Sequence, residues 1–506
     1  MDRRHFLAGA SALGGLAATG LPVVAQTPLL TVATRQLEVK RKAATVYGIT
    51  GAGGRSGILA AEGDRFSGAV LNGTADPLVM HWHGQIHAPA EQDRARTGGG
   101  ELAVGQSDSH DFRLTPGTHW MHSHQLTEQQ LLAAPMVTRE KDAGDVQDVI
   151  IMLHDFSFRS PAELLAGLGG ANAHAAHAGH GAPAAAPPAG GNAHAGHGGM
   201  NHGAAAPAPM AGMNHGNMNH GNMNHGAMNH GGMNHGSMAV HANDVSYDAF
   251  LANDRTLDDP EVVRVERGGK VRLRIINGAT ATAFFIDTGA VTASCIAVDG
   301  NPCVPHPGRR FPLAQGQRID LLVTIPAGGG AFPIFAQVEA ARMLTGIVLA
   351  TAGATVRKLS DKAEHAALHT DLSLDLLLRA AQPLPQKPAS RTVHLLLGEE
   401  PNYRFTINGA IHGEHKPITA KVGERIEFMF MNPTMMMHPM HIHGHHFQVV
   451  GSRGGRFAGP VRDTVIVPPH TPVFVAIDFD KPGSWYLHCH HLYHMATGMM
   501  TEVVVS

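Results

Sequence analysis

The sequence predicts an all-β protein of three related domains, and two observations carry this prediction. The pattern Gly-x-(Arg/Lys)-(Phe/Val/Ile)-x5-Asn occurs at Gly63–Asn72, Gly268–Asn277 and Gly423–Asn432, each copy typical of a turn that enters a strand. Short β-branched runs such as 461–467 and 501–505 alternate with glycine and proline. Many short strands separated by turns indicate Greek-key sandwiches or barrels, and 506 residues suit about three of them.

The first 25 residues are typical of a twin-arginine export signal. Arg3 and Arg4 precede an Ala/Gly/Leu run that ends in small residues near Ala25. This run is too short and too weakly apolar to span a membrane. We therefore expect residues 1–25 to be a cleaved signal that directs the protein to a bacterial periplasm, without stable membrane insertion.

A low-complexity tract follows the first domain, which we expect over 26–165. Within 166–242 the sequence Met-Asn-His-Gly recurs six times, beginning at Met200. Such a composition cannot form a core, so we expect disorder in the absence of metal. Because thioethers and imidazoles bind copper, we expect extra copper on this tract. Subtracting 171–241 makes the spacings between the three repeat copies similar, which favours an insert between the first and second domains.

The rest of the chain predicts a second domain at 243–356, a linker at 357–390 and a third domain at 391–506. Residues 161–168 and 372–381 are the best candidates for short helices. Cys295 and Cys303 flank a turn-like segment, which is compatible either with a hairpin disulfide or with two unpaired cysteines.

Histidine is the anomaly in the composition. The chain has 37 histidines against 5 tyrosines and 3 tryptophans, while its net charge is only −3. This balance gives no electrostatic reason to expect nucleic acid or an anionic membrane as a partner. We expect a monomer.

Four short histidine stretches at the two ends of the chain carry metal-ligand residues. They are His81-Trp82-His83-Gly84, His122-Ser123-His124, His438-Pro439-Met440-His441-Ile442-His443, and His488-Cys489-His490 followed by His494 and Met499. One such pair would be a weak signal, but four stretches with one cysteine indicate a set of copper sites.

The spacing around Cys489 predicts a blue copper site. Side chains alternate along a strand, so His488 and His490 face one way and Cys489 faces the other. A thiolate, two histidines and a weak axial methionine are the ligands of blue copper. The strong ligands would be His438, Cys489 and His494, and the weak ligand Met499.

The remaining histidines predict a second, inner group of coppers. Six of them provide three nitrogens for each of two coppers: His83, His122, His124, His443, His488 and His490. His81 and His441 remain for a third copper with an open coordination sphere. An open cluster of reducible metal suits the binding and four-electron reduction of O2.

These motifs resemble those of the multicopper oxidases, which include laccases and bacterial cuprous oxidases of the copper-resistance type. The resemblance covers nearly all of the chain outside the signal and the tract. It implies three cupredoxin domains and four copper ions: type 1 on His438, Cys489, His494 and Met499, type 2 on His81 and His441, and a type 3 pair on the six other histidines. Zinc would have no use for the thioether or for the His-Cys-His bridge.

The residues before the third motif leave the substrate open. Met436 matches a methionine of the family's cuprous oxidases, but Thr434 stands where those enzymes have an aspartate, and 357–390 lacks their methionine-rich helix. Met435–Met437 and Met440 could equally be core residues. The tract favours Cu(I) as substrate, oxidised for copper tolerance, and the alternatives are a laccase acting on phenols and a copper-storage protein.

One acid is predicted to deliver protons to reduced O2. Asp93 matches the family acid after the first motif, although one extra residue intervenes. The family's second acid follows the last type 1 histidine, and Met495 occupies that position here. We therefore expect Asp93 to be the critical acid, with Cys489 carrying electrons. Seven other histidines are expected to be structural or superficial: His154, His394, His412, His415, His445, His446 and His470.

Overall fold

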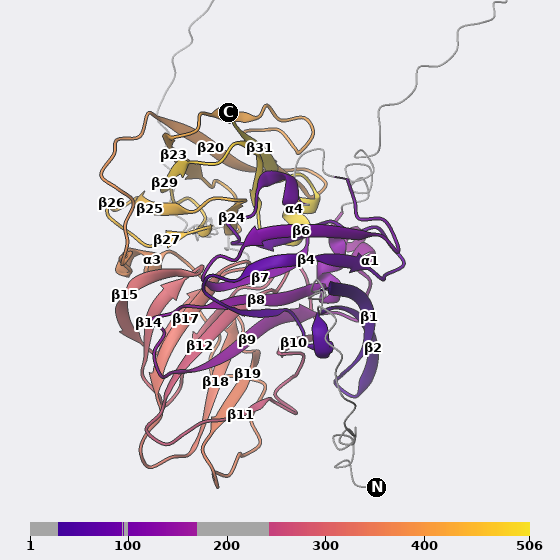
Figure 1. Ribbon diagram of the computed structural model, residues 1–506, viewed down its shortest axis with the longest axis vertical. Coiled ribbons are helices and arrows are strands. Elements are labelled where there is room, and N and C mark those ends of the chain that lie inside the picture. Colours follow the sequence, from indigo (N-terminus) through magenta and orange to yellow (C-terminus); the bar gives the residue numbers. More distant parts are fainter. Residues whose placement is uncertain (1–28, 94, 96–99, 170–241) are drawn as a thin grey trace, which may run out of the picture. The chain divides into compact units, whose positions relative to one another are not determined.

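The computed structural model describes residues 29–93, 95, 100–169 and 242–506 (Figure 1). The predicted export signal and nearly all of the histidine- and methionine-rich tract lie outside these residues. The described residues form six β-sheets with few helices, which confirms the all-β prediction. None of their helices is long and apolar enough to cross a membrane.

The first two sheets share one apolar core, which includes Val32, Phe66 and Met121. One sheet has the strand order β2-β1-β4-β6, with bounds Lys42–Thr50, Leu29–Val39, Arg65–Asn72 and Ser107–Arg113. The other has the order β3-β8-β7-β5, with bounds Ile58–Ala61, Ala133–Arg139, Gly117–Ser123 and Met80–His83. Short 3-10 turns span Ala52–Gly54, Ala90–Gln92 and Leu126–Gln130.

The second pair of sheets encloses the core that contains Leu273 and Ile347. One sheet has the order β10-β9-β12-β17-β14-β15, with bounds Ala249–Ala252, Gln147–Phe156, Lys270–Asn277, Arg318–Thr324, Ala293–Val298 and Asn301–Gly308. The other has the order β11-β19-β18-β13-β16, with bounds Val262–Arg264, Leu344–Ala350, Ala331–Val338, Phe284–Asp287 and Arg310–Leu313.

The third pair encloses the core that contains Phe428, Cys489 and Met499. One sheet has the order β21-β20-β23-β29-β25-β26, with β27 beside β25; the bounds are Arg404–Ile407, Arg391–Glu400, Glu424–Met431, Val473–Phe479, Phe447–Ser452, Gly455–Arg456 and Val461–Arg462. The other has the order β22-β31-β30-β24-β28, with bounds Ile418–Ala420, Met500–Val505, Gly483–Cys489, His438–Ile442 and Thr464–Val467.

The repeat found in the sequence occupies the same position in each pair of sheets. Its strands, β4, β12 and β23, each pair in parallel with one neighbour and antiparallel with another. The closing asparagine is buried in all three copies, and its amide donates to two carbonyl oxygens further along the chain, one of them in the loop that follows the strand: Asp76 and Leu102 for Asn72, Thr282 and Leu313 for Asn277, Met436 and Val467 for Asn432. The conserved spacing therefore fixes the loop that leaves the strand.

The strand β9 shows where the low-complexity tract enters the fold. It pairs in parallel with β12 and antiparallel with β10, as β1 does with β4 and β2 (Figure 1). The predicted first domain, 26–165, therefore takes in a strand of the second pair of sheets. In the sequence, the tract lies between β9 and β10, which are neighbouring strands of the second pair of sheets.

Short helices lie at both predicted places. The helix α1, Pro161–Gly167, begins with a capping box between Ser160 and Glu163, and α3, Ser373–Leu377, lies in the predicted linker. A third, α4, spans Leu492–Ala496. Cys295 and Cys303 are buried and not bonded to each other, so the structure favours the unpaired alternative.

Candidate metal centre

Side chains alternate along β24 and β30, so the residues of the histidine motifs lie on two faces of the sheet. Met440 pairs with Cys489, and His441 with His488, across the two strands. Met440 and Cys489 point into the core of the third pair of sheets. The histidines of the opposite face lie against β5 and β7 of the first pair, where His81 pairs with His122. Two metal-ligand groups thus lie on either side of one sheet.

Three donor atoms meet inside the third core. Cys489 Sγ lies 3.7 Å from His438 Nδ1 and 3.7 Å from His494 Nδ1, and the two nitrogens are 3.2 Å apart. Met499 is fully buried, and its main-chain N–H and C=O bond to His494 and Cys489. Burial raises the pKa of the Cys489 thiol, so its thiolate form requires a cation beside it.

On the opposite face, three ring nitrogens converge, and none of them has a hydrogen-bond partner among the residues that the structure describes. They are His83 Nδ1, His122 Nε2 and His490 Nε2. All three side chains are buried, and one donor atom from each lies within 4.8 Å of the others. A buried nitrogen without a partner costs about 1–3 kcal/mol. Three such atoms at one point fit a metal ion with three histidine ligands.

A second group of three histidines lies beside the first. His488 Nε2 is 3.2 Å from His124 Nε2 and 3.1 Å from His443 Nε2. His81 Nε2 and His441 Nε2, from the first and third pairs of sheets, are 3.2 Å apart. Eleven of the twelve predicted ligands therefore fall into four groups of converging donors.

Burial keeps most of these imidazoles neutral, which is the form that binds metal. It lowers the pKa of His441 to about 4 and that of His494 to about 3. The pKa of six others is also lowered far below the ordinary value, chiefly by burial: His81, His83, His124, His438, His488 and His490.

Each of these histidines has a second ring nitrogen that does not face the converging donors, and three buried carboxylates contact such nitrogens. Asp93, the predicted acid, lies between two motifs, with Oδ1 3.2 Å from His81 Nδ1 and Oδ2 2.9 Å from His443 Nδ1. Asp463 Oδ1 is 3.1 Å from His83 Nε2, and Glu128 Oε2 is 3.0 Å from His122 Nδ1. Burial raises the pKa of Glu128.

Asp463 and Glu128 were not predicted from the sequence. Asp463 forms a buried ion pair with Arg318, whose Nη2 is 2.6 Å from Oδ2. The pKa of Asp463 is lowered because Arg318 and His83 outweigh the effect of burial. No local pattern relates Asp463 to His83, which is 380 residues away. Glu128 lies only six residues after its histidine, on the 3-10 turn Leu126–Gln130, and this short separation was the signal that the sequence offered.

The residues in and just before the third motif either pack into apolar cores or contact its first histidine. Met440 lies in the third core, and Met437 packs with Ala283 and Ile466. Thr434 Oγ1 lies 2.8 Å from His438 Nε2. The position that carries an aspartate in cuprous oxidases thus supplies a neutral hydroxyl to the outer nitrogen of His438.

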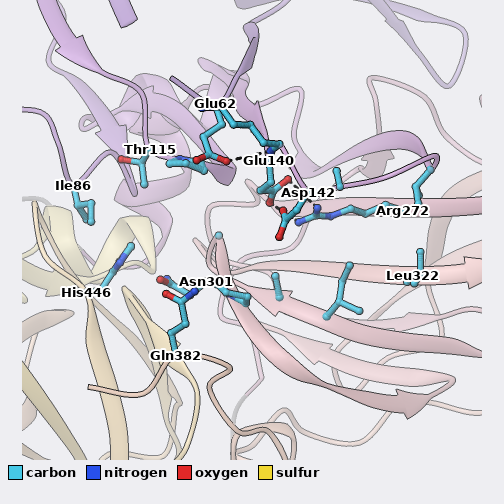
Figure 2. A pocket seen from close by; sticks show the side chains of 18 of the residues that line it. Glu62, Ile86, Thr115, Glu140, Asp142, Arg272, Asn301, Leu322, Gln382 and His446 are labelled. Atoms are coloured by element: carbon cyan, nitrogen blue, oxygen red, sulfur yellow. Dashed lines mark hydrogen bonds and ion pairs between the residues drawn. The ribbon is translucent and has the colours of Figure 1, made fainter. Parts of the chain in front are cut away.

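A cavity of about 790 Å³ lies between segments of all three pairs of sheets (Figure 2). Thr115, Asn301 and His446 are among its lining residues, so His446, which we expected to be structural, borders a cavity. Pro116 also lines it, and its carbonyl accepts from His119 Nε2 at 3.0 Å. His119 Nδ1 lies 3.3 Å from Arg318, so this contact chain joins the cavity to Asp463 and the histidine cluster.

Fold and site together define a copper oxidase, and comparisons with known proteins agree. Three family models, each described as multicopper oxidase, match residues 31–142, 205–356 and 385–506. The chain belongs to the multicopper oxidase family. It is an oxidoreductase that holds copper cofactors and uses O2.

Several relatives carry more specific names. Multicopper oxidase MmcO of Mycobacterium tuberculosis is 27% identical over 459 residues, which cover 88% of this chain and 80% of that protein. Copper resistance protein A of Escherichia coli is 35% identical over 133 residues, 26% of this chain and 22% of that one. Laccase-4 of Thanatephorus cucumeris is 26% identical over 267 residues, 45% and 50% of the two chains. The crystal structure of a multi-copper oxidase from Pseudomonas thermotolerans has a TM-score of 0.62 at 20% identity, covering 94% of this chain and 99% of that one.

Proposed function

We propose that this protein oxidises Cu(I) to Cu(II) in the bacterial periplasm, as part of copper tolerance, and passes the electrons to O2. The proposal includes four copper ions. One would be held by His438, Cys489, His494 and Met499, one by His81 and His441, and a coupled pair by the two groups of three histidines. Copper bound there supplies one-electron steps and a place for O2.

The protein's own residues prepare this chemistry. The peptide between Cys489 and its neighbours His488 and His490 links the two groups of ligands through a few covalent bonds. Asp93 holds the Nδ1 atoms of His81 and His443 and can return a proton to the cluster. The arrangement excludes bulk water, since all these side chains are buried.

The single observation that favours Cu(I) over other donors is the place where the histidine- and methionine-rich tract is attached. Leu164 and Leu165, just before it, and Val245, just after it, pack in one cluster with Tyr493. Tyr493 is the neighbour of His494. Copper collected between these two attachment points is held at a high effective concentration beside the proposed type 1 site.

The test is O2 consumption by the purified, copper-loaded protein with Cu(I) and then with a phenol. Uptake that is much faster with Cu(I), and that is lost in Cys489→Ser, is the expected result. Fast turnover of the phenol with negligible Cu(I) activity would instead make the protein a laccase. If neither donor supported uptake, the protein would be a copper-binding protein, which the eleven converging donors argue against because storage needs no coupled cluster.

A further inference from the structure

Two polar side chains outside the predicted ligand set lie against His494. The ring of His491 stacks on that of His494, with centroids 3.7 Å apart and 12° between the planes. Asp244 places Oδ1 3.5 Å from His491 Nε2 and Oδ2 3.8 Å from His494 Nε2. The Tyr403 hydroxyl donates a hydrogen bond to Oδ2 and holds the carboxylate in this position.

Four polar atoms of this cluster are buried and lack hydrogen-bond partners among the described residues. His491 is 2% exposed, and neither of its ring nitrogens has a partner. The same holds for Asp244 Oδ1 and His494 Nε2. Each such atom costs about 1–3 kcal/mol unless a ligand satisfies it. The group of His83, His122 and His490 has this same signature.

The charges and distances indicate a small cation. Asp244 forms ion-pair contacts only with histidines among the described residues, so its carboxylate has no permanent positive partner there. A nitrogen and an oxygen that share one ion stand about 3–4 Å apart, because each bond to the metal is roughly 2 Å long. The 3.5 Å between His491 and Asp244 suits this geometry, whereas the close stack on His494 leaves no room for an aromatic ring.

On the opposite side of the type 1 group, the described residues place no carboxylate against the histidine. There the neutral hydroxyl of Thr434 lies 2.8 Å from His438 Nε2 and occupies that nitrogen.

We infer that Asp244 and His491 form a binding site for Cu(I) and that this is where the ion gives up its electron. The inference rests on the proposed function and identifies its substrate site. Imidazole binds copper well in both oxidation states, and the harder carboxylate favours the doubly charged product. The reaction balances as 4 Cu(I) + O2 + 4 H⁺ → 4 Cu(II) + 2 H2O, with O2 as the oxidant that the enzyme already uses.

The experiment uses the full-length, copper-loaded enzyme and Ag(I), a monovalent ion that the enzyme cannot oxidise. Silver bound beside His494 should shift the blue absorption band of type 1 copper, whereas silver bound away from the type 1 ligands is silent in that band. Cu(I) turnover is measured in parallel. The variants are His491→Ala, His491→Gln and Asp244→Asn, with the exposed His394→Ala as matched control.

We expect the variants at 244 and 491 to lose the silver-induced shift and to raise KM for Cu(I) at least tenfold, with a smaller change in kcat. A normal blue band before silver is added shows that each variant has folded around its type 1 copper. An unchanged silver shift and an unchanged KM in all three variants would overturn the inference and leave Cu(I) oxidation standing. Loss of the silver shift in an enzyme without Cu(I) turnover would keep the binding site and overturn the proposed function.

Discussion

At the scale of single residues, carboxylates decide which nitrogen of an imidazole is left for a metal. Asp463 takes Nε2 of His83 and leaves Nδ1 facing the cluster, whereas Glu128 takes Nδ1 of His122 and leaves Nε2. Asp93 takes Nδ1 of His443. Because a carboxylate partner fixes both the tautomer and the orientation of the ring, each acid determines where its histidine can bind copper.

Replacing Asp463 should therefore disturb the inner cluster and spare the type 1 site. In Asp463→Asn the contact that holds His83 Nε2 is weakened, and Arg318 keeps only the more distant buried carboxylate of Asp299, 3.8 Å away. We expect loss of inner copper and a roughly 10–100-fold fall in O2 uptake, with the blue band retained. Copper content per protein and the absorption spectrum measure this, and a variant with full copper and full uptake would contradict it.

Asp93→Asn tests the proton role at the cluster. Asparagine keeps the size of the side chain but cannot return a proton, so O2 uptake should fall roughly 10–100-fold while the copper content changes less. The exposed Asp111, which pairs with Arg65 on the protein surface, provides the control Asp111→Asn. Full O2 reduction by Asp93→Asn would show that another acid, such as Glu128, delivers the proton.

At the scale of elements, the turn between α4 and β31 sets the position of Met499, the proposed fourth ligand of the type 1 copper. Gly498 has φ +129, and a Cβ at this position would lie 2.4 Å from Ile411 Cγ2 and 2.8 Å from the Phe405 carbonyl. The next residue, Met499, bonds through its main chain to His494 and Cys489. The turn can adopt this path only with glycine.

Gly498→Ala should therefore move Met499 and alter the blue band. We expect a spectral shift, together with a loss of about 1–3 kcal/mol in the free energy of unfolding. Gly409→Ala is a matched control, because Gly409 also has a positive φ, +75, but a Cβ there meets nothing within 4 Å. An equal effect of the two substitutions would mean that backbone strain alone, and not the contact with Ile411, is responsible.

How far the sequence predicts this molecule depends on how local each feature is. The ligand motifs are readable because strand alternation converts the spacing of His488, Cys489 and His490 directly into two faces. The closing asparagines of the repeat are readable for the same reason. Asp463 and Asp244 are not, since each meets its histidine only through tertiary packing. The parallel pairing of β9 with β12 was not predicted, because the residues of a strand do not show which strand lies beside it.

At the scale of the whole molecule, the proposed metal ligands join the first pair of sheets to the third. The contacts of His81 with His441 and of His124 with His488 cross between them. Metal that binds only the folded chain stabilises it, by about 4 kcal/mol when present at a thousand times its dissociation constant. Removal of copper should therefore lower the melting temperature of the protein, and the first and third pairs of sheets should still unfold in one transition.

The copper-free protein should also lose stability as the pH falls. Burial and Arg318 lower the pKa of His119 to about 4, and burial lowers that of His446 to about 3. In the unfolded chain both titrate near 6.5. Between pH 6.5 and 4 the unfolded chain binds protons that the folded chain does not, so the free energy of unfolding decreases through this window. Thermal unfolding from pH 7.5 to 4.5 should show a melting temperature that is level above pH 6.5 and falls below it, less steeply in His119→Gln; a level curve throughout would contradict this.

The tract at 171–241 acts, in our proposal, on the supply of substrate and not on the chemistry. Its deletion should leave the blue band and the turnover of a phenol unchanged, because α1 and β10 pack in the described fold without it. The deletion should raise KM for Cu(I), most clearly when copper is scarce. Tethered ligands increase the local copper concentration only while the free copper concentration is below the dissociation constant of those ligands. A replacement of equal length without histidine or methionine separates copper binding from mere tether length. If both the deletion and the replacement kept the wild-type Cu(I) kinetics, and cells kept their copper tolerance, the tract would have no part in delivering Cu(I).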